Sequence, residues 1–292
     1  MPTAHLSDRG VVRVSGEDAK KLLDGLLTCD MDLVTPAAPR FGALLTPQGK
    51  LLFDFMVFEA PPEDGGGYYL DCLRFMAPDL AKRLGFYKLR AKVAIDDLSE
   101  SLAVLAGWGD AERPSEEIGL VGDDPRLAAL GWRAIVAAED AQLLTGGPAY
   151  HAHRIALGVP EGGKDFLFND AFPHEALMDQ LNGIDFDKGC YVGQEVVSRM
   201  QHRGTARTRV VPVVYEDGFV SEPGAEVTAG ERRLGKVGTG ANGRGLVMVR
   251  LDRAADALAA GETIRAGGLP VRLEKPDWVR FAFPDEAKST TA

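Results

Sequence analysis

One stretch of the chain combines a cysteine with a lysine and two glycines: Lys188-Gly189-Cys190-Tyr191-Val192-Gly193-Gln194-Glu195. Val196, Val197 and Met200 follow at helical spacing, so we expect Cys190 near a helix N-terminus. That position and the neighbouring Lys188 would both favour the thiolate, the form of cysteine that attacks electrophiles and binds metals. The alternative is a small buried residue in a tight turn, because cysteine is often simply buried. The residues alone leave both interpretations open.

Other residues that commonly bind metals are too scattered to predict a metal site. Cys29, Cys72 and Cys190 are odd in number and far apart, which fits neither a disulfide framework nor a closed zinc site. We therefore expect reduced thiols. His151 and His153 are two residues apart, so on a helix they would point to different faces.

The one basic cluster follows the cysteine stretch and consists of Arg199, His202, Arg203, Arg207 and Arg209. Guanidinium groups suit carboxylates and phosphates, so the cluster is either an anion-recognition site or a solvated face. The whole chain is acidic, with 33 Lys+Arg against 43 Asp+Glu and a net charge of -10. It lacks the positive field that supports non-specific nucleic-acid binding, and no direct nucleic-acid partner is expected.

The elements before this stretch must position it, and the first hundred residues read as α+β. A capping box formed by Ser15 and Asp18 is expected to start an amphipathic helix that continues to Leu27. The apolar runs FGALLT and LLFDFMVF flank a turn at 46–49, which predicts a β-hairpin. The run YYLDCL is a third strand. A helix from Pro78 then leads into the strand-like run KLRAKVAID.

After residue 98 the strand and helix patterns are weaker, and from residue 210 the sequence becomes β-rich. LAVLAGW and RAIVAAE read as strands, and residues 149–157 and 174–181 read as helices. From residue 210 onward, short β runs between glycine turns predict a small barrel or sandwich. Gly238, Gly240 and Gly243 have the spacing of a dinucleotide-binding loop, but the strand-like GLVMVR follows them where a helix is required. We interpret these glycines as a hairpin turn.

Composition bounds the class of protein. With 45% hydrophobic residues over 292 residues, the chain is long enough for about two globular domains, and three small units would also fit. No apolar run reaches the roughly 18 to 20 residues of a membrane-spanning helix, and the start MPTAHLSDRG has no signal-peptide core. These features predict a cytoplasmic protein with no membrane partner.

The cysteine stretch resembles the mark K-G-C-[FY]-x-G-Q-E of the YgfZ branch of the glycine-cleavage T-protein (GcvT-like) family of folate-binding proteins. Weaker matches are SGEDAKKLLDGLLTCD, LTPQGKLLFDF, KLRAKV, RIALGVP and FPHEALMDQLNGIDFDKGC. The resemblance implies an α+β fold with two interleaved subdomains around a central folate channel and a C-terminal β-barrel. On that basis we divide the chain into 1–98 and 99–207 for the folate-binding region, 208–285 for the barrel and 286–292 for a tail.

The resemblance also implies a function. It points to tetrahydrofolate, or a one-carbon derivative, as ligand and to assembly or repair of iron–sulfur proteins with four-iron clusters, with an indirect effect on tRNA modification. The implied partners are the assembly machinery or client iron–sulfur enzymes. By position in matching stretches, Arg154 and Glu175 would lie near the pterin, and Arg199 and Arg203 are candidate cations for the glutamate tail. Cys190, aided by Lys188, would engage a cluster intermediate or a folate-borne one-carbon unit.

The aminomethyltransferase branch of the same family is the nearest alternative. It resembles this chain at the hairpin but carries paired aspartates there, whereas this sequence reads Leu52-Phe53-Asp54-Phe55. A phenylalanine can neither ionise nor accept a proton, which leaves Asp54 as the one candidate acid or base. The alternatives are therefore a tetrahydrofolate-dependent aminomethyl or one-carbon transferase or demethylase, and a folate-binding scaffold without turnover. Whether a reaction is catalysed stays open.

Overall fold

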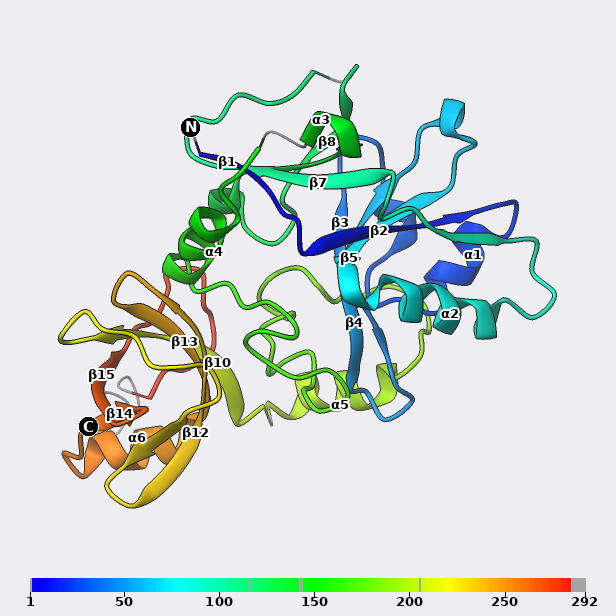
Figure 1. The fold of residues 1–292 in the computed structure, drawn as a ribbon. Coiled ribbons are helices and arrows are strands. Elements are labelled where there is room, and N and C mark those ends of the chain that lie inside the picture. Colours follow the sequence, from blue (N-terminus) through cyan, green and yellow to red (C-terminus); the bar gives the residue numbers. More distant parts are fainter. Residues whose placement is uncertain (1, 116, 142–143, 205, 285–292) are drawn as a thin grey trace. The chain divides into compact units, whose positions relative to one another are not determined.

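The computed structural model describes residues 2–115, 117–141, 144–204 and 206–284. The chain forms two compact units, each built from two separate segments (Figure 1). Unit 1 comprises Met1–Tyr150 and Leu181–Val196, and unit 2 comprises His151–Gln180 and Val197–Ala292. The predicted segments 1–98 and 99–207 therefore both contribute to unit 1.

A five-stranded antiparallel sheet is the centre of unit 1. Its order is β3 (Arg40–Leu45), β4 (Leu51–Glu59), β5 (Tyr68–Leu73), β2 (Arg9–Ser15) and β6 (Ala94–Asp97). One face is covered by α1 (Ala19–Asp24) and α2 (Ala77–Lys88), whose buried Leu23 and Leu80 join the same core as Phe55 and Leu70 of the sheet. Burial of these apolar side chains stabilises the layer by roughly 1.5–3 kcal/mol each.

A second antiparallel sheet of unit 1 packs on the face of the five-stranded sheet that the two helices leave uncovered. Its order is β1 (Thr3–His5), β7 (Leu102–Gly107), β9 (Trp132–Ala137) and β8 (Gly119–Asp123). Val104 and Ile135 from this sheet share one buried core with Met56 and Phe58 from the first. The short elements of unit 1 are the 3-10 helices η1 (Met31–Leu33), η2 (Pro62–Asp64), η3 (Arg74–Met76) and η4 (Ala128–Leu130), and α3 (Ala138–Ala141).

Buried charges also join the two sheets of unit 1. The carboxylate of Asp71 on β5 accepts from Arg9 Nε on β2 at 2.6 Å and from Arg133 Nη1 on β9 at 2.8 Å. Arg133 also donates to the Tyr150 hydroxyl at 2.6 Å. Because each buried charge has charged or hydrogen-bonding partners, the network satisfies the condition under which burial of ions is tolerated.

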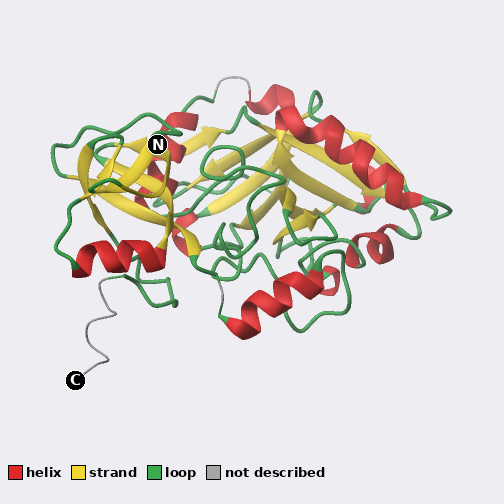
Figure 2. Ribbon diagram, turned by 90° about the horizontal axis from the view of Figure 1, so that it is seen from below, coloured by secondary structure: helices red, strands yellow, loops and turns green. Residues whose placement is uncertain are grey.

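Unit 2 contains a closed six-stranded β-barrel. Its order is β10 (Thr208–Tyr215), β13 (Arg244–Arg250), β12 (Arg232–Ala241), β11 (Glu226–Ala229), β14 (Ile264–Ala266) and β15 (Leu269–Leu273). Ala254 and Ala257 of α6 (Leu251–Ala259) are part of the barrel core, and Figure 2 shows this helix beside the barrel strands. The remaining helices of the described chain are α4 (Gly147–Ala156) and α5 (Gln194–Arg203), and each begins in a segment of unit 1 and ends in a segment of unit 2.

Most predicted strands are confirmed, and so are the helices predicted from Pro78, at 149–157 and after Cys190, whereas the capping box and one helix are wrong. Ser15 ends β2 and does not cap α1, and the Asp18 carboxylate instead accepts from the backbone N–H of Lys92 at 2.8 Å. The predicted helix at 174–181 is a series of turns, because Leu177 has a φ of 62°, which an α-helix does not accommodate. The run KLRAKVAID is extended as a strand only from Ala94.

The glycine-rich segment of the barrel is a hairpin turn, as predicted. Gly238 and Gly240 lie in β12, and Asn242 and Gly243, with φ values of 52° and 73°, turn the chain into β13. Two consecutive left-handed residues are typical of the tight turns that join β-strands. Among the described residues, no helix is long and apolar enough to cross a bilayer.

Candidate functional site

Cys190 lies in an exposed loop that precedes α5. The helix begins at Gln194, four residues after Cys190, so the cysteine lies near the helix N-terminus, as predicted, but outside its first turn. The tight-turn alternative, a small buried residue, is excluded because Cys190 is exposed. Gly189 beside it has open space around the position of a Cβ.

The other two cysteines differ from Cys190 in both burial and acidity. Cys29 and Cys72 are buried free thiols, and burial raises the pKa of each to about 12. Thiolate is the reactive and metal-binding form, so these two side chains are inert at neutral pH. Of the three cysteines, all of them described, Cys190 is the one whose thiol reaches solvent.

Lys188 holds the loop to the segment that follows α1. Its ammonium donates to the backbone carbonyls of Asp24 at 2.7 Å, Leu27 at 3.0 Å and Cys29 at 2.8 Å. It also pairs with the Asp24 carboxylate at 3.0 Å, and only 1% of its side chain is exposed. The three carbonyls account for the three N–H donors of the ammonium, and the carboxylate adds an opposite charge beside it. The geometry therefore gives Lys188 an anchoring role, whereas the sequence predicted that it would assist the thiol.

Two glycines fit the end of the loop against the β3–β4 hairpin. Gly193 has a φ of 84°, and a Cβ on it would lie 2.6 Å from the carbonyl oxygen of Thr46. A Cβ on Gly49 in the hairpin turn would lie 2.9 Å from Cβ of Val196. Neither position has room for a larger side chain, so the two glycines allow the predicted hairpin and the cysteine loop to pack in direct contact.

Thr28 adds a third anchor that the sequence did not single out. Its hydroxyl donates to the carbonyl of Gly183 at 2.6 Å and accepts from the N–H of Ala43 at 2.9 Å, and its own carbonyl accepts from the N–H of Asp185 at 2.8 Å. A fully buried threonine flanked by Leu27 and Cys29 gives no sequence signal for such a role.

A cavity of about 300 Å³ adjoins the residues that lead into the loop. It is lined by Cys29, Asp30, Leu33, Arg40, Asn182, Ile184, Asp185, Phe186 and Asp187. The sequence did not predict a role for Asp30 or Arg40. Both lie more than 140 residues before the loop in the sequence, and only the fold brings them to this cavity.

The other motif residues in unit 1 are structural or exposed. Tyr191 is buried, which raises the pKa of its hydroxyl, and its ring centroid lies 5.6 Å from the Lys188 ammonium. The Gln194 side chain donates to the carbonyl of Gly189 at 3.4 Å, and Glu195 is exposed in the first turn of α5. Asp54 is buried in β4, opposite Ala43 of β3.

Arg154, the predicted pterin contact, lies in unit 2 in a buried polar network. Its guanidinium donates to Asp165 at 2.7 Å, to the carbonyl of Val159 at 3.1 Å and to the hydroxyl of Thr239 at 3.1 Å, and it pairs with Glu161 at 3.0 Å. The side chain is fully enclosed by protein. This geometry favours a role in connecting α4 to β12 over direct contact with a ligand.

The remaining predicted binding residues also belong to unit 2. Glu175 is half-buried and accepts from the N–H of Phe172 at 2.8 Å. Arg199 and Arg203 are exposed on α5, whereas Arg209 of the predicted basic cluster is buried. The cluster therefore does not form one continuous anion-recognition face.

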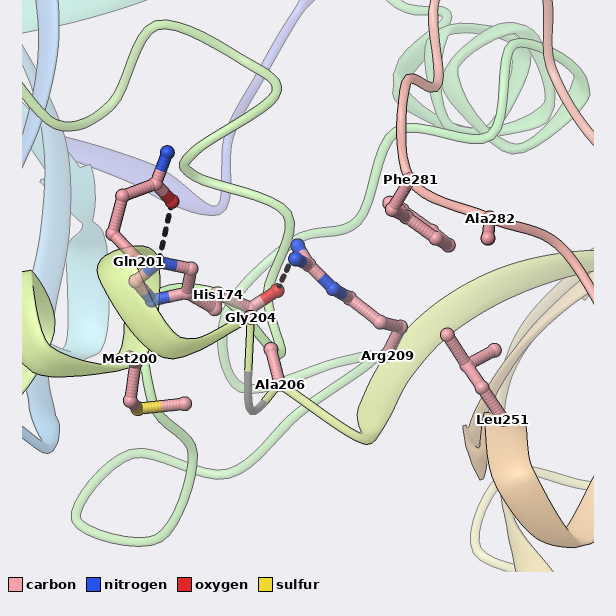
Figure 3. Close-up of a pocket in the computed structure, with 9 residues that line it drawn as sticks. All are labelled: His174, Met200, Gln201, Gly204, Ala206, Arg209, Leu251, Phe281 and Ala282. Atoms are coloured by element: carbon pink, nitrogen blue, oxygen red, sulfur yellow. Dashed lines mark hydrogen bonds between the residues drawn. The ribbon is translucent and has the colours of Figure 1, made fainter.

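Arg209 lines a cavity of about 220 Å³ within unit 2, together with His174, Met200, Gln201, Gly204, Ala206, Leu251, Phe281 and Ala282 (Figure 3). Its guanidinium donates to the carbonyl of His174 at 2.8 Å and to Asp179 at 2.5 Å, and it lies 4.5 Å from the centroid of the Phe281 ring. His174 Nε2 and Gln201 Oε1 are 3.0 Å apart. Burial and, to a lesser extent, Arg209 lower the pKa of His174.

Within the described part of the chain, no group of three or more His, Cys, Asp or Glu side chains could hold a metal ion. His151 instead contacts Arg154 at 3.1 Å and Lys164 at 2.9 Å.

Comparison with known proteins identifies the fold. Residues 207–281 match the family described as CAF17, C-terminal beta-barrel domain. The structure of glycine cleavage system aminomethyltransferase T from Bartonella henselae superposes with a TM-score of 0.72, covering 95% of this chain and 86% of that chain at 16% sequence identity. The predicted α+β, GcvT-like fold with a C-terminal barrel is confirmed.

Comparison of sequences identifies the family. The iron–sulfur cluster assembly factor IBA57, mitochondrial, of Homo sapiens is 32% identical over 94% of this chain and 84% of its own length. The homolog of Mycosarcoma maydis is 35% identical over 73% of this chain, and the matched region spans 57% of that protein. Both names give a mitochondrial location, which contradicts the predicted cytoplasmic one. A relative this similar over most of both chains shows common membership: the chain belongs to the family of IBA57 iron–sulfur cluster assembly factors.

Proposed function

We propose that this protein acts in the assembly or repair of iron–sulfur proteins and that Cys190 is the residue that contacts the cluster. The observation that carries the proposal is the contrast between the exposed thiol of Cys190 and the buried thiols of Cys29 and Cys72. The names of the family's members support the assembly role.

The cluster is cargo in this proposal. The Cys190 thiol first gives its proton to solvent or to a base on the partner, and the resulting thiolate then donates a sulfur lone pair to one iron. It replaces one ligand of the carrier protein, which leaves with its own electron pair, so the oxidation state of the cluster does not change. Iron–sulfur clusters usually need about four protein ligands, and one cysteine supplies a single one. The other ligands therefore come from a carrier or client protein, and the contact lasts only while that partner is bound.

The anchors of the loop serve this role by limiting the positions of Cys190. Lys188 fixes the residue two positions before the cysteine, and Gly193 fixes the residue three positions after it. A thiol held between two fixed points loses less conformational entropy when it binds than one on a free loop.

A second part of the proposal concerns tetrahydrofolate. Arg199 and Arg203 are exposed on α5 and would hold the carboxylates of the glutamate tail, and Glu175 remains the candidate for the pterin. Arg154 is left out of this site because its donors bond to protein acceptors. Assignment to the YgfZ branch and an indirect effect on tRNA modification belong to the same proposal.

The assembly role is tested in cells that lack the gene, by the activity of a four-iron enzyme such as aconitase. Wild-type protein, Cys190→Ala and Cys72→Ala are restored separately at matched protein levels. We expect wild type and Cys72→Ala to restore the activity and Cys190→Ala to fail. Full rescue by Cys190→Ala would show that the thiol is not required. Unchanged aconitase activity after deletion of the gene would refute the assembly role.

Folate binding is tested separately by calorimetric titration of the purified protein with tetrahydrofolate. We expect Arg203→Ala to weaken binding by about ten-fold, because a charge-assisted contact to a carboxylate contributes roughly 1.5–3 kcal/mol. Lys236→Ala, which removes an exposed cation from the barrel, is the matched control and should bind as wild type does. Absence of binding by the wild-type protein would refute this part alone.

A further inference from the structure

The outer face of α2 carries large apolar side chains where a surface helix usually carries polar ones. Phe86 is 65% exposed and Leu89, directly after the helix, is 88% exposed. Phe75, in η3 directly before the helix, is 75% exposed. The core-facing residues Ala77, Leu80 and Leu84 are fully buried on the opposite side. Three such side chains within the 15 residues from Phe75 to Leu89 differ from the single exposed apolar residues found on most proteins.

The three side chains belong to one continuous stretch of chain. Phe75 lies in η3 directly before α2, Phe86 lies in the last turn of α2, and Leu89 follows its last residue. Leu89 has a φ of 46°, a backbone conformation that is unusual for a bulky non-glycine residue and that here directs the chain away from the helix. Phe75 and Leu89 therefore flank the two ends of α2, and Phe86 lies in its last turn.

The same face is positively charged although the protein is acidic. Residues 82–92 contain five basic and no acidic residues, against a net charge of -10 for the chain. Lys82, Arg83, Lys88 and Arg90 have no ion pair with any described residue, whereas Lys92 pairs with Glu17 at 2.7 Å. Asp79 in the first turn is the acidic residue on the exposed side of α2. Four cations without an ion pair among the described residues therefore lie in the same stretch of chain as Phe86 and Leu89.

We propose that the outer face of α2, with Phe75, Phe86 and Leu89 and the cations of the same stretch, docks on the surface of an anionic lipid bilayer. Phenylalanine and leucine at the boundary of head groups and acyl chains, with lysine and arginine beside them, are typical of helices that lie on membranes. Each cation near an anionic surface contributes to such binding. This inference concerns attachment to one leaflet and goes beyond the proposed assembly role.

The overall negative charge does not prevent this contact. The Debye length at physiological ionic strength is about 8 Å, so only charges close to the membrane act on it. Over residues 75–92 the chain carries five basic residues and one acidic residue, Asp79, which leaves a positive balance on this stretch.

A lipid surface fits this face better than an acidic protein does. The apolar side chains protrude, and a fluid bilayer accepts protruding groups without a matching cavity, whereas a protein partner must supply one. A protein segment could instead enter the cavity of about 420 Å³ beside Leu22, Leu26 and Tyr87. Docking of an acidic protein is therefore the rival outcome.

The test is co-sedimentation of the full chain with large unilamellar vesicles. One set contains phosphatidylcholine and phosphatidylglycerol in roughly a two-to-one ratio, and the other contains phosphatidylcholine alone. The variant Phe86→Ser/Leu89→Ser removes two exposed side chains and should leave the fold intact. Phe219→Ser/Leu167→Ser is the matched control, because these residues of unit 2 are 73% and 61% exposed.

We expect wild type and the control variant to pellet with the anionic vesicles, and binding to weaken as salt is raised. Phe86→Ser/Leu89→Ser should lower the partition coefficient by at least about ten-fold, given the transfer free energy of the two side chains. Equal binding to neutral and anionic vesicles, or no difference between the two double variants, would overturn the proposal. A third outcome would also overturn it: wild type does not bind vesicles, yet Phe86→Ser/Leu89→Ser fails to restore aconitase activity. That result would indicate that this face binds a protein partner.

Discussion

Gly193 of the cysteine loop and Gly49 of the β3–β4 turn approach so closely that a Cβ on Gly193 would lie 3.2 Å from the Cα of Gly49. The same Cβ would lie 2.6 Å from the carbonyl oxygen of Thr46, a distance that real Cβ atoms do not adopt. Two segments about 140 residues apart in the sequence are thus in direct backbone contact, and this contact determines where the chain leaves Cys190 and enters α5.

Gly193→Ala should destabilise the protein by about 2 kcal/mol or more, because it combines an unfavourable positive φ with a backbone clash. Gly189→Ala is the matched change in the same loop, and it should leave the free energy of unfolding within about 0.5 kcal/mol of wild type. Urea denaturation of both variants measures the difference. Equal stability of the two would mean that the hairpin contact does not constrain the loop.

Lys188→Met should also be destabilising, by roughly 2–4 kcal/mol, since it leaves backbone carbonyls without their buried donor. Lys236→Met replaces an exposed lysine of the barrel and should change the free energy of unfolding by less than about 0.5 kcal/mol. Both are compared by urea denaturation. A Lys188→Met protein as stable as the control would contradict the anchoring role.

Thiol titration with an aromatic disulfide reagent should find one fast thiol in the native protein and three in denaturant. Cys29 and Cys72 are protected because they are buried and their pKa values are raised to about 12. In Cys190→Ala the fast thiol should disappear while the other two still appear on unfolding. Rapid reaction of two or three thiols in native wild type would refute the assigned burial.

Stability should depend on pH through His174. Burial and Arg209 lower the pKa of its imidazole below the ordinary value of 6.5, while Asp179 and Gln201 act in the opposite direction. The unfolded state therefore binds the proton first as the pH falls, so the stabilising contribution is present above pH 6.5 and is lost as the pH falls through the folded pKa. The stability advantage of wild type over His174→Gln should shrink across that range. An advantage independent of pH, measured by denaturation at several pH values, would contradict this assignment.

The sequence predicted most of the strands and all but one of the helices. The hairpin, YYLDCL and the barrel runs were recognisable because apolar residues alternate or cluster between turn residues. The helix expected at 174–181 failed because its apolar residues have helical spacing but Leu177 adopts a left-handed conformation inside a set of turns. Long-range contacts override local propensity there, since Val210 donates its N–H to the carbonyl of Glu175.

The sequence was sufficient to predict the reactive residue of the candidate site, but not the contacts that hold its loop in place. Cys190 stands out by type and by flanking glycines. Nothing in the local sequence reveals that Lys188 reaches three carbonyls near α1, because such contacts arise only from the fold. For Arg154, a positional resemblance suggested a ligand contact, and the side chain instead lies among Asp165, Glu161 and Thr239.

The exchange of segments between the two units has a consequence for synthesis and dissection of the chain. Unit 1 is completed by Leu181–Val196, which leaves the ribosome only after the first segment of unit 2, His151–Gln180. Neither unit can therefore mature before its neighbour has begun to form. A single cut within 151–180 leaves neither unit whole, because it separates each unit from part of its own chain.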